Sequence, residues 1–432
     1  MESASGATRQ PVTEKLKSYY MDLRVHIGSN LLGKPVKVTA SKALTLHNII
    51  KECLNRKGMD IVGIVDCAAP TVLREIRQLQ IQGELAEMDE GGLRHRERVT
   101  ILPASEVETY DPKDPSLGRE AGKGGGISHH VAYFPFLRQM EEFSKVISPY
   151  ITNMELSTQR CGLRTRELYA VVEALGGVVF PAHAFTPHKS VYGRCTDRLS
   201  RLLPEGGVDK LPALELGLSA DTDLADRIAE LSGTTFLSNS DAHSLAKIGR
   251  EYNEARLLAP TFKEVMLAMR REAGRAITIN YGLDPKLGKY HRTHCESCGH
   301  ICTETPPAFS CEKCGSRDIT LGVLDRIVSI QDFPEPRHPE HRARYRYQIP
   351  LEFVPGVGKK VLDRLIGTFG SEMAVLHEAS NESLRKVVGS QVAGRIIAAR
   401  EGALRVQPGG GGKYGQVEKE VAERMEQLTF RF

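Results

Sequence analysis

The sequence lacks the features that would place the protein in or across a membrane. None of its apolar runs reaches the roughly 18 residues that a membrane-spanning helix needs. The first ten residues are polar and small and contain no apolar signal core, so we expect a disordered leader over residues 1–18. We therefore expect a protein that does not enter a membrane. We also expect a monomer.

A strong charge bias is also missing. The 58 Lys and Arg residues against 54 Asp and Glu residues leave a net charge of +4, and the contents of 41% hydrophobic and 26% charged residues are ordinary for a globular protein. So small a charge tolerates a nucleic-acid partner without requiring one. The 432 residues predict roughly two to three domains.

The nine cysteines are not distributed as in a disulfide framework. Five lie in one short segment and four are scattered, which predicts metal binding in a reducing cytoplasm. Two C-x-x-C-G motifs about a dozen residues apart are typical of a zinc ribbon, which we assign to residues 284–329. Four thiolates leave no open position on the ion, so this zinc is expected to be structural. The expected ligands are Cys295, Cys298, Cys311 and Cys314, whereas His294, His300 and Cys302 fit the spacing less well.

No G-x-G-x-x-G motif follows the first strand-like run, so a dinucleotide site is not indicated. From about Tyr19 to Tyr281, β-type runs alternate with amphipathic helical runs, which argues for a parallel sheet. The strand-like runs are 61–65, 99–102, 131–134, 178–180, 213–216, 234–237 and 276–279. The helical runs are 46–56, 71–79, 136–147, 164–175, 224–231 and 262–271. About seven units favour a closed α/β barrel.

The C-terminal part has the pattern of a DNA-binding module. Residues 330–348 are rich in Pro, His and Arg and are interpreted as a linker. A P-G-x-G turn then precedes a helix, and a looser version follows about thirty residues later, which predicts a tandem helix-hairpin-helix over residues 349–405. Its exposed N–H groups and lysines would bind DNA phosphates through Gly356, Gly358, Lys359, Lys360 and Gly389. The alternative is an ordinary pair of helical turns with glycine at the helix end.

The tail, residues 406–432, begins with Pro408 and four glycines, which predict a flexible linker. Its last residues, Gln427–Phe432, resemble the short peptide that docks on bacterial sliding clamps. The alternative is a terminal amphipathic helix that folds back on the core.

Metal-ligand side chains recur just past several strand-like runs. The C-terminal ends of barrel strands are where α/β barrels collect catalytic residues, and a mixture of imidazoles and carboxylates suits a hydrolytic centre of Zn, Mn or Fe. A single histidine is more often structural, so the argument depends on the recurrence. The strand-end residues are Asp22, His26, Asp66, Glu106, His129, His130, His183, Glu215, Asp241 and His243.

Their order and types resemble the polymerase-and-histidinol-phosphatase (PHP) family of metal-dependent phosphoesterases, whose fold is a distorted (β/α)7 barrel. Within it, the segments 182–189, 215–221, 239–243, 280–284 and 288–292 are similar to endonuclease Q. The ribbon, the hairpins and the Gly-rich tail also follow in that family's order. The resemblance implies a PHP barrel over residues 19–283, followed by the four-cysteine zinc ribbon and the C-terminal tandem helix-hairpin-helix module.

The resemblance also implies DNA repair, with cleavage on the 5′ side of deaminated bases (uracil, hypoxanthine, xanthine) and abasic sites by a protein of the cytoplasm and nucleoid. Two or three divalent ions (Zn, Mn, Mg or Fe) would lie at the barrel mouth. Their implied ligands are Asp22, His26, Asp66, Glu106, His130, His183, Asp241 and His243, of which Asp241, Glu106 and His183 are catalytic. His188 and Lys189 would contact the damaged DNA, unless their loop is only a surface loop.

Two departures from the PHP pattern leave one metal position open. Arg24 and Cys67 stand where that pattern has histidines. An arginine cannot ligate a metal, although it could bind a DNA phosphate through two nitrogens. Cys67 is a soft ligand or a small core residue. The alternative functions are therefore a phosphoesterase of another substrate and a non-catalytic DNA-binding scaffold.

Overall fold

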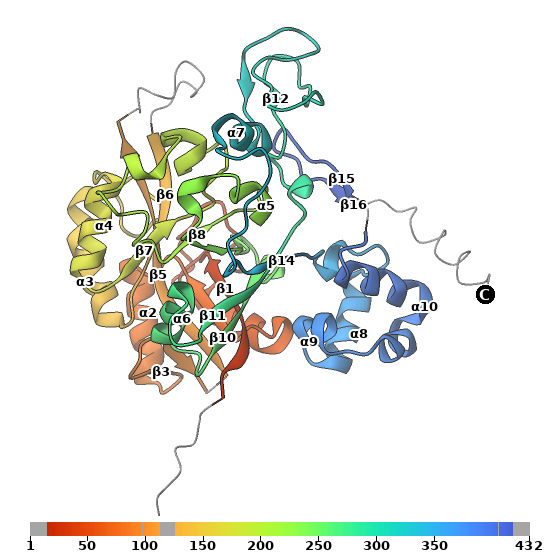
Figure 1. Cartoon of the computed structure of the whole chain (residues 1–432). Coiled ribbons are helices and arrows are strands. Elements are labelled where there is room, and N and C mark those ends of the chain that lie inside the picture. The colour runs from red at the N-terminus through yellow and green to blue at the C-terminus, as the bar shows by residue number, and fades with distance from the viewer. Residues whose placement is uncertain (1–14, 97, 113–125, 405, 418–432) are drawn as a thin grey trace, which may run out of the picture.

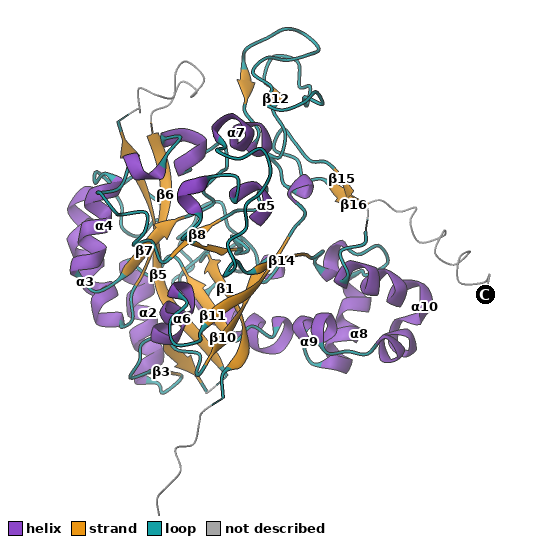
Figure 2. Cartoon of the chain, in the orientation of Figure 1, coloured by secondary structure: helices purple, strands orange, loops and turns teal. Residues whose placement is uncertain are grey.

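The computed structural model describes residues 15–96, 98–112, 126–404 and 406–417. These residues form an α/β fold around one mixed sheet, with a separate group of helices beside it (Figure 1; Figure 2). The sheet has the order β14-β11-β10-β1-β2-β5-β4-β3, and β6 pairs with β5 and β7. Its strands are β1 (Lys17–Val25), β2 (Ile61–Ile64), β3 (Leu85–Glu87), β4 (Leu93–His95), β5 (Val99–Asp111), β6 (Gly126–Tyr133), β7 (Val178–Pro181), β10 (Tyr252–Leu257), β11 (Ala276–Gly282) and β14 (Arg344–Tyr347).

The predicted α/β fold is present, but the sheet is not the regular parallel barrel expected from the alternating pattern. Strands β1, β2 and β5 run parallel, whereas β10 pairs antiparallel with β1 and β11, and β6 pairs antiparallel with β5 and β7. Consecutive strands such as β5 and β6 pair in this way because no crossover helix is needed between them. The ladders do not close into a ring.

A separate parallel pair contacts β7 on one side and β11 on the other. It consists of β8 (Ala213–Glu215) and β9 (Thr235–Leu237). Single hydrogen bonds join the pair to its neighbours: Ala184 N donates to Glu215 O at 2.9 Å, and Ala242 N donates to Arg24 O at 3.2 Å. These bonds bring the ends of β7, β8, β9 and β1 together at one mouth.

Five of the six predicted helical runs begin and end close to the predicted residues, whereas the run 224–231 is replaced by a short helix and a separate turn. The helices are α1 (Leu46–Glu52) with its continuation η1 (Cys53–Lys57), α2 (Pro70–Ile81), α3 (Leu137–Ile147), α4 (Thr165–Ala174), α5 (Thr222–Ala225) and α6 (Phe262–Arg270). Single turns are η3 (Ser148–Tyr150), η4 (Val191–Cys195), η5 (Leu199–Arg201), η6 (Ala229–Leu231), η7 (Leu245–Lys247), η8 (Pro285–Leu287) and η9 (Leu351–Phe353). Thr45 and Asp221 cap α1 and α5 by accepting bonds from the backbone N–H groups of Asn48 and Leu224, as their positions before the helical runs predict.

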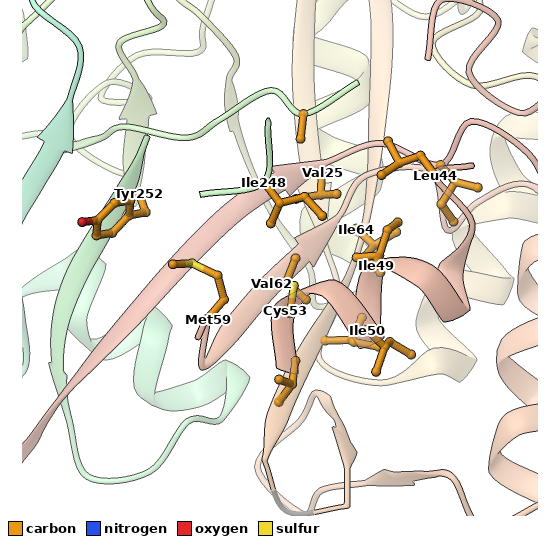
Figure 3. Close-up of a cluster of buried hydrophobic side chains, with 14 of the residues drawn as sticks. Val25, Leu44, Ile49, Ile50, Cys53, Met59, Val62, Ile64, Ile248 and Tyr252 are labelled. Carbon is orange, nitrogen blue, oxygen red and sulfur yellow. The ribbon is translucent and has the colours of Figure 1, made fainter. Parts of the chain in front are cut away.

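The main core lies between β1, β2 and the helix α1. Figure 3 shows Ile49, Ile50 and Cys53 facing Val62 and Ile64 of β2. Each large apolar side chain that is buried in this way contributes about 1.5–3 kcal/mol relative to exposure. This packing holds β1 and β2 firmly, so the polar residues at their ends have defined positions.

A β-bulge in β1 decides which of its polar residues reach the mouth. Asp22 is opposite Val62 and Val25 is opposite Ile64, so β1 has one extra residue between these two pairs. As a result Leu23 packs in one apolar cluster and Val25 packs in another. In a regular strand, two residues separated by two positions would lie on the same face. Bulges re-aim side chains in this way near functional sites.

The predicted linker between the ribbon and the helical module is partly a strand. Residues 344–347 form β14, which pairs in parallel with β11 at the edge of the sheet. Before it, α7 (Val323–Ile330) packs on the barrel, and the ribbon contributes the short strands β12 (His294–Cys295) and β13 (Ile319–Thr320). The composition of the segment did not reveal this strand, because its side chains are mostly exposed and its apolar residues are few.

The helical module consists of α8 (Lys359–Phe369), α9 (Glu372–His377) and α10 (Asn381–Arg400). A kink at Gly389 (φ 79°) divides α10 into two helices. Gly356 (φ 90°) lies in the turn before α8. Both turns therefore lie where the sequence places the hairpins, and positive φ at each explains the glycine.

The glycine-rich tail is ordered where the structure describes it, so the prediction of a flexible linker is wrong for residues 406–417. Strands β15 (Val406–Gln407) and β16 (Gln416–Val417) pair antiparallel. Gly409 N donates to Lys286 O at 2.6 Å, and Gly415 N donates to Leu287 O at 3.0 Å. A Cβ atom at Gly409 would lie 2.5 Å from Gly415 N, so the glycines permit close backbone packing. The proposed clamp peptide, Gln427–Phe432, and the predicted leader up to residue 14 lie outside the described residues.

Candidate functional site

The first candidate metal position is formed by His26, Asp241 and His243. One ligand atom from each lies within 4.8 Å of the other two. His26 Nδ1 is 3.0 Å from Asp66 Oδ1, which leaves Nε2 directed at Asp241 Oδ1, 3.3 Å away. Asp66 was predicted as a ligand, but here its carboxylate holds His26 in place, an arrangement typical of the residues that support metal-binding histidines.

The second candidate position is formed by Glu106 of β5, His129 of β6 and His183 after β7. Their ligand atoms also lie within 4.8 Å of one another. Glu106 Oε1 lies 3.5 Å from His129 Nδ1, and Glu106 Oε2 lies 3.8 Å from His26 Nε2 in the first group. Glu106 thus stands between the two positions.

Two ligand residues have strained backbones. His183 has φ 30° and Asp241 has φ 48°, in the left-handed region that side chains other than glycine rarely adopt. Each comes directly after a strand end, where the chain turns sharply over the mouth. Such strain costs about 1–3 kcal/mol and is found mainly at functional sites.

Three ligand atoms at these positions have no hydrogen-bond partner among the described residues. They are His26 Nε2, His129 Nδ1 and Asp241 Oδ1, and all three are buried. Burying an unpaired polar atom is costly, so orphaned atoms that converge from three strand ends indicate a missing partner. Imidazole and carboxylate donors suit Zn, Mn or Fe ions, and the residues therefore fit the divalent ions that the sequence predicts.

Arg24 occupies the space between the candidate positions. Its Nε donates to Glu106 Oε2 at 2.8 Å, its Nη1 donates to Glu215 Oε1 at 2.7 Å, and its Nη2 lies 3.4 Å from Asp241 Oδ1. Arg24 was predicted to contact DNA, but its donors are directed at these protein carboxylates. Lys37, which the sequence did not single out, lies 2.9 Å from Glu106 Oε1. Burial alone would raise the pKa of Glu106, but Arg24 and Lys37 hold it well below its usual range.

Besides Asp66, two further predicted ligands do not belong to either position. Asp22 is buried on the far side of the β1 bulge, where its carboxylate accepts hydrogen bonds from Ser240 N at 3.1 Å and Gly249 N at 2.9 Å. His130 points to the opposite face of β6 from His129, and its Nδ1 lies 3.1 Å from the Tyr169 hydroxyl. Burial lowers the pKa of His130 to about 3. The prediction of His130 as the ligand is therefore wrong, because the sequence does not show which of two adjacent strand residues faces the mouth.

Cys67 is a core residue and not a ligand. It belongs to the apolar cluster between the sheet and its helices, and its Sγ lies 3.2 Å from Ile64 O. Burial raises the pKa of this thiol to about 12, which opposes the thiolate that a metal would need. The core interpretation of Cys67 is therefore confirmed.

An open cavity of about 560 Å³ lies over the two positions. Its lining includes Arg24, His129, His183, Asp241 and His243 from the centre. Basic side chains surround them: His188, Lys189, Lys247, Arg250 and Lys289. The cavity therefore favours an anionic ligand.

Two tyrosines make the outer wall of this cavity. Tyr290 stands edge-on to His188 with ring centroids 5.1 Å apart. Tyr414, from the ordered tail, accepts a hydrogen bond from Arg250 Nη1 at 3.0 Å, and Lys289 Nζ lies 4.6 Å from its ring centre. Tyr414 was missed because it lies within a segment that resembles a linker. The neighbouring Tyr192 does not face the cavity, since it is buried and donates to Glu230 Oε1 at 2.7 Å.

The four predicted zinc ligands converge as expected. Cys295, Cys298, Cys311 and Cys314 offer Sγ atoms that lie within 4.8 Å of one another. The Cys295–Cys314 and Cys298–Cys311 pairs are both separated by 3.6 Å, a spacing compatible with thiolates around one tetrahedral zinc. Gly299 and Gly315 have φ values of 71° and 72°, so each knuckle turns back through a glycine.

The predicted DNA-contacting groups of the helical module are all on its surface. Gly356, Gly358, Lys359, Lys360 and Gly389 are exposed. Gly358 caps α8, so the first N–H groups of that helix and the two lysines point to the same end. Such an end can hold a phosphate, although DNA binding by this module stays a prediction.

Within the described ranges, no helix is both long and apolar enough to span a membrane. A family model described as PHP-associated matches residues 221–273. The protein YqxK of Bacillus subtilis (strain 168) is 44% identical over 404 residues, which cover 93% of this chain and 100% of the relative.

Two solved structures match nearly the whole chain. The lesion-specific endonuclease PfuEndoQ from Pyrococcus furiosus has a TM-score of 0.78 and 32% identity, covering 96% of this chain and 99% of that one. A complex of Endonuclease Q with a 27-mer duplex substrate, with an abasic lesion at the active site, has a TM-score of 0.76 and 32% identity, covering 94% and 98%. The predicted PHP-type α/β fold is therefore confirmed, and the chain shares the fold of these endonuclease Q structures along almost its full length.

Proposed function

Because this chain belongs to the endonuclease Q family, we propose that it is a metal-dependent DNA repair endonuclease. It hydrolyses the phosphodiester bond on the 5′ side of deaminated bases and abasic sites. The observation that carries the proposal is the convergence of the orphaned ligand atoms His26 Nε2, His129 Nδ1 and Asp241 Oδ1 beneath a basic cavity. In a non-catalytic scaffold that binds no ion, these buried ligand atoms would stay without a partner, which is costly.

The residues of the centre have separate tasks in this reaction. Divalent ions, when bound, generate a hydroxide nucleophile at neutral pH and neutralise charge on the scissile phosphate. His26, Asp241 and His243 would hold one ion, and Glu106, His129 and His183 would hold the other. Asp241 also lines the cavity, so its carboxylate faces the space that would receive the substrate.

The cavity supports the recognition of a single displaced nucleotide. Its volume of about 560 Å³ is in the range of pockets for small ligands, and Tyr290 and Tyr414 provide aromatic surfaces on which a base can stack. Damaged or mispaired bases cost less to extrude from a duplex than paired bases, which supplies part of the selectivity. The nearby Lys189 and Lys289 would hold the flanking phosphates.

The helical module would increase affinity without reading the sequence. Exposed glycine turns and lysines contact the DNA backbone, which carries no base information. Binding to a sliding clamp through Gln427–Phe432 stays a separate prediction.

A lesion-panel assay tests the proposal. The purified protein is incubated with Mn²⁺, Mg²⁺ or Zn²⁺ and with duplexes that carry one uracil, hypoxanthine, xanthine or abasic site, each labelled at the 5′ or the 3′ end. We expect one nick on the 5′ side of the lesion. Equal cutting of undamaged duplexes would contradict lesion specificity. Turnover of phosphate monoesters without any nicking would instead indicate a phosphoesterase of another substrate.

A further inference from the structure

Arg24 has an unusual environment for an arginine. Its side chain is only 2% exposed, and it contacts carboxylates from three different parts of the fold: Glu106 of β5, Glu215 of β8 and Asp241 after β9. Two of these carboxylates, Glu106 and Glu215, are buried, and Asp241 is partly exposed. A cation that is shared by three carboxylates from separate elements is the arrangement that proteins use to hold a metal ion. Here the cation belongs to the chain itself.

Arg24 lies directly beside the two metal positions. It shares Asp241 with the position of His26 and His243, and it shares Glu106 with the position of His129 and His183. A guanidinium has no acceptor atom and keeps its charge, so it cannot ligate an ion and cannot be stripped by a chelator.

Glu215 is the carboxylate that Arg24 keeps from binding a metal ion. Its Oε1 accepts hydrogen bonds from Arg24 Nη1 at 2.7 Å and from His183 N at 3.0 Å. Its Oε2 accepts one from Asn239 Nδ2 at 2.9 Å. Both oxygens of Glu215 are therefore satisfied by protein donors.

We propose that Arg24 is a resident cation that fills one cation position of the centre, so that the barrel mouth holds two exchangeable metal ions and Glu215 is not a metal ligand. This inference rests on the proposed function for the identity of the site, and it decides between the two-ion and three-ion forms that the sequence left open. The guanidinium supplies permanent positive charge next to the ions, whatever metal is available.

The test is the metal content of the full-length protein. The chain is treated with a chelator, reloaded with Mn²⁺, dialysed, and analysed by mass spectrometry that counts Mn and Zn separately. We expect about two Mn²⁺ per chain, as in two-metal sites, besides the zinc of the ribbon. A wild-type protein that binds three exchangeable Mn²⁺ would overturn the inference.

Three variants sharpen the result. E215Q should keep the Mn²⁺ content of the wild type, D241N should lose about one ion, and R24H should gain about one because an imidazole can ligate where a guanidinium cannot. Loss of an ion in E215Q, or no gain in a folded R24H, would contradict the inference. If R24H does not fold, as judged by circular dichroism, the Mn²⁺ contents of the wild type and of E215Q still test the inference.

Failure of the inference about Arg24 can be distinguished from failure of the proposed endonuclease function. A protein that holds two Mn²⁺ and does not nick damaged DNA would overturn only the proposed endonuclease activity. A protein that nicks damaged DNA and holds three Mn²⁺ would overturn only the role of Arg24.

Discussion

Asp66 Oδ1 lies 3.0 Å from Nδ1 of His26, and this contact determines which nitrogen of the imidazole faces the cavity. A charged carboxylate can only accept a hydrogen bond, so it favours the tautomer of neutral His26 that carries its proton on Nδ1, and the lone pair of Nε2 can then ligate an ion. Asp66 is itself held by Ile27 N at 2.5 Å and by the Ser157 hydroxyl. Burial would raise the pKa of Asp66, but His26 outweighs it and lowers the pKa, so the carboxylate stays charged. The geometry of the first metal position therefore depends on a residue that does not touch the ion.

Removing this support should weaken metal binding without abolishing it. We expect D66N to lower metal affinity and nicking by about 10- to 100-fold, the usual effect of losing such a partner. Excess Mn²⁺ should restore much of the activity. A D66N protein with no activity at any Mn²⁺ concentration would indicate that Asp66 ligates the ion directly.

Loss of the ligand itself should be far more severe. We expect D241A to reduce nicking by about a thousand-fold or more, because several kcal/mol of charge stabilisation at the phosphate disappear. DNA affinity should change little, since the helical module is intact. D223A, a change at an exposed carboxylate, is the control. Undiminished nicking by D241A would exclude Asp241 as a ligand.

The two lysines at the start of α8 should contribute to DNA affinity through contacts with phosphates. K359A with K360A should weaken binding and reduce the slope of log affinity against log salt by about 1 for each lysine that contacts a phosphate. K263A is a matched control, since Lys263 pairs with Glu90 far from the module. A salt slope equal to that of the wild type would mean that this end of α8 does not contact DNA.

The zinc ribbon should depend on its four cysteines and on no other. C298S should lose the zinc and make the ribbon sensitive to limited proteolysis, because the short segment relies on the ion for its folding energy. C302S should keep the zinc, because Cys302 Sγ lies apart from the cluster, near Ser310 O at 3.9 Å. Zinc loss in C302S would contradict the assignment.

Tyr414 should contribute to substrate binding through its ring. We expect Y414A to raise KM for a lesion-containing duplex by about ten-fold, since stacking of one base on an aromatic ring contributes about 1–3 kcal/mol. Y414F should lose only the hydrogen bond with Arg250 and stay close to the wild type. If both variants behave like the wild type, the tail does not contact the nucleotide.

Local patterns in the sequence were sufficient to predict much of the fold and part of the candidate site. The spacing of the C-x-x-C-G motifs predicted the cysteine cluster, because ligands on one short loop are close in space whatever surrounds them. The alternating apolar runs predicted β2, β7, β8, β9, β11 and five of the six helical runs to within about three residues, but they missed β1 and β10. The recurrence of His, Asp and Glu after strands predicted a centre at one mouth, and His26, Glu106, His183, Asp241 and His243 do converge there.

The sequence by itself determined the kinds of ligand and the strand ends that carry them, while only the tertiary structure decided which side chains face the mouth. His129 replaces His130 because strand pairing sets the parity of β6, and Asp22 turns away because a bulge shifts β1 by one residue. The glycine-rich tail became a wall of the cavity because its backbone bonds to residues more than a hundred positions earlier. Parity, bulges and such long-range contacts depend on partners distant in the chain, so no local pattern can reveal them.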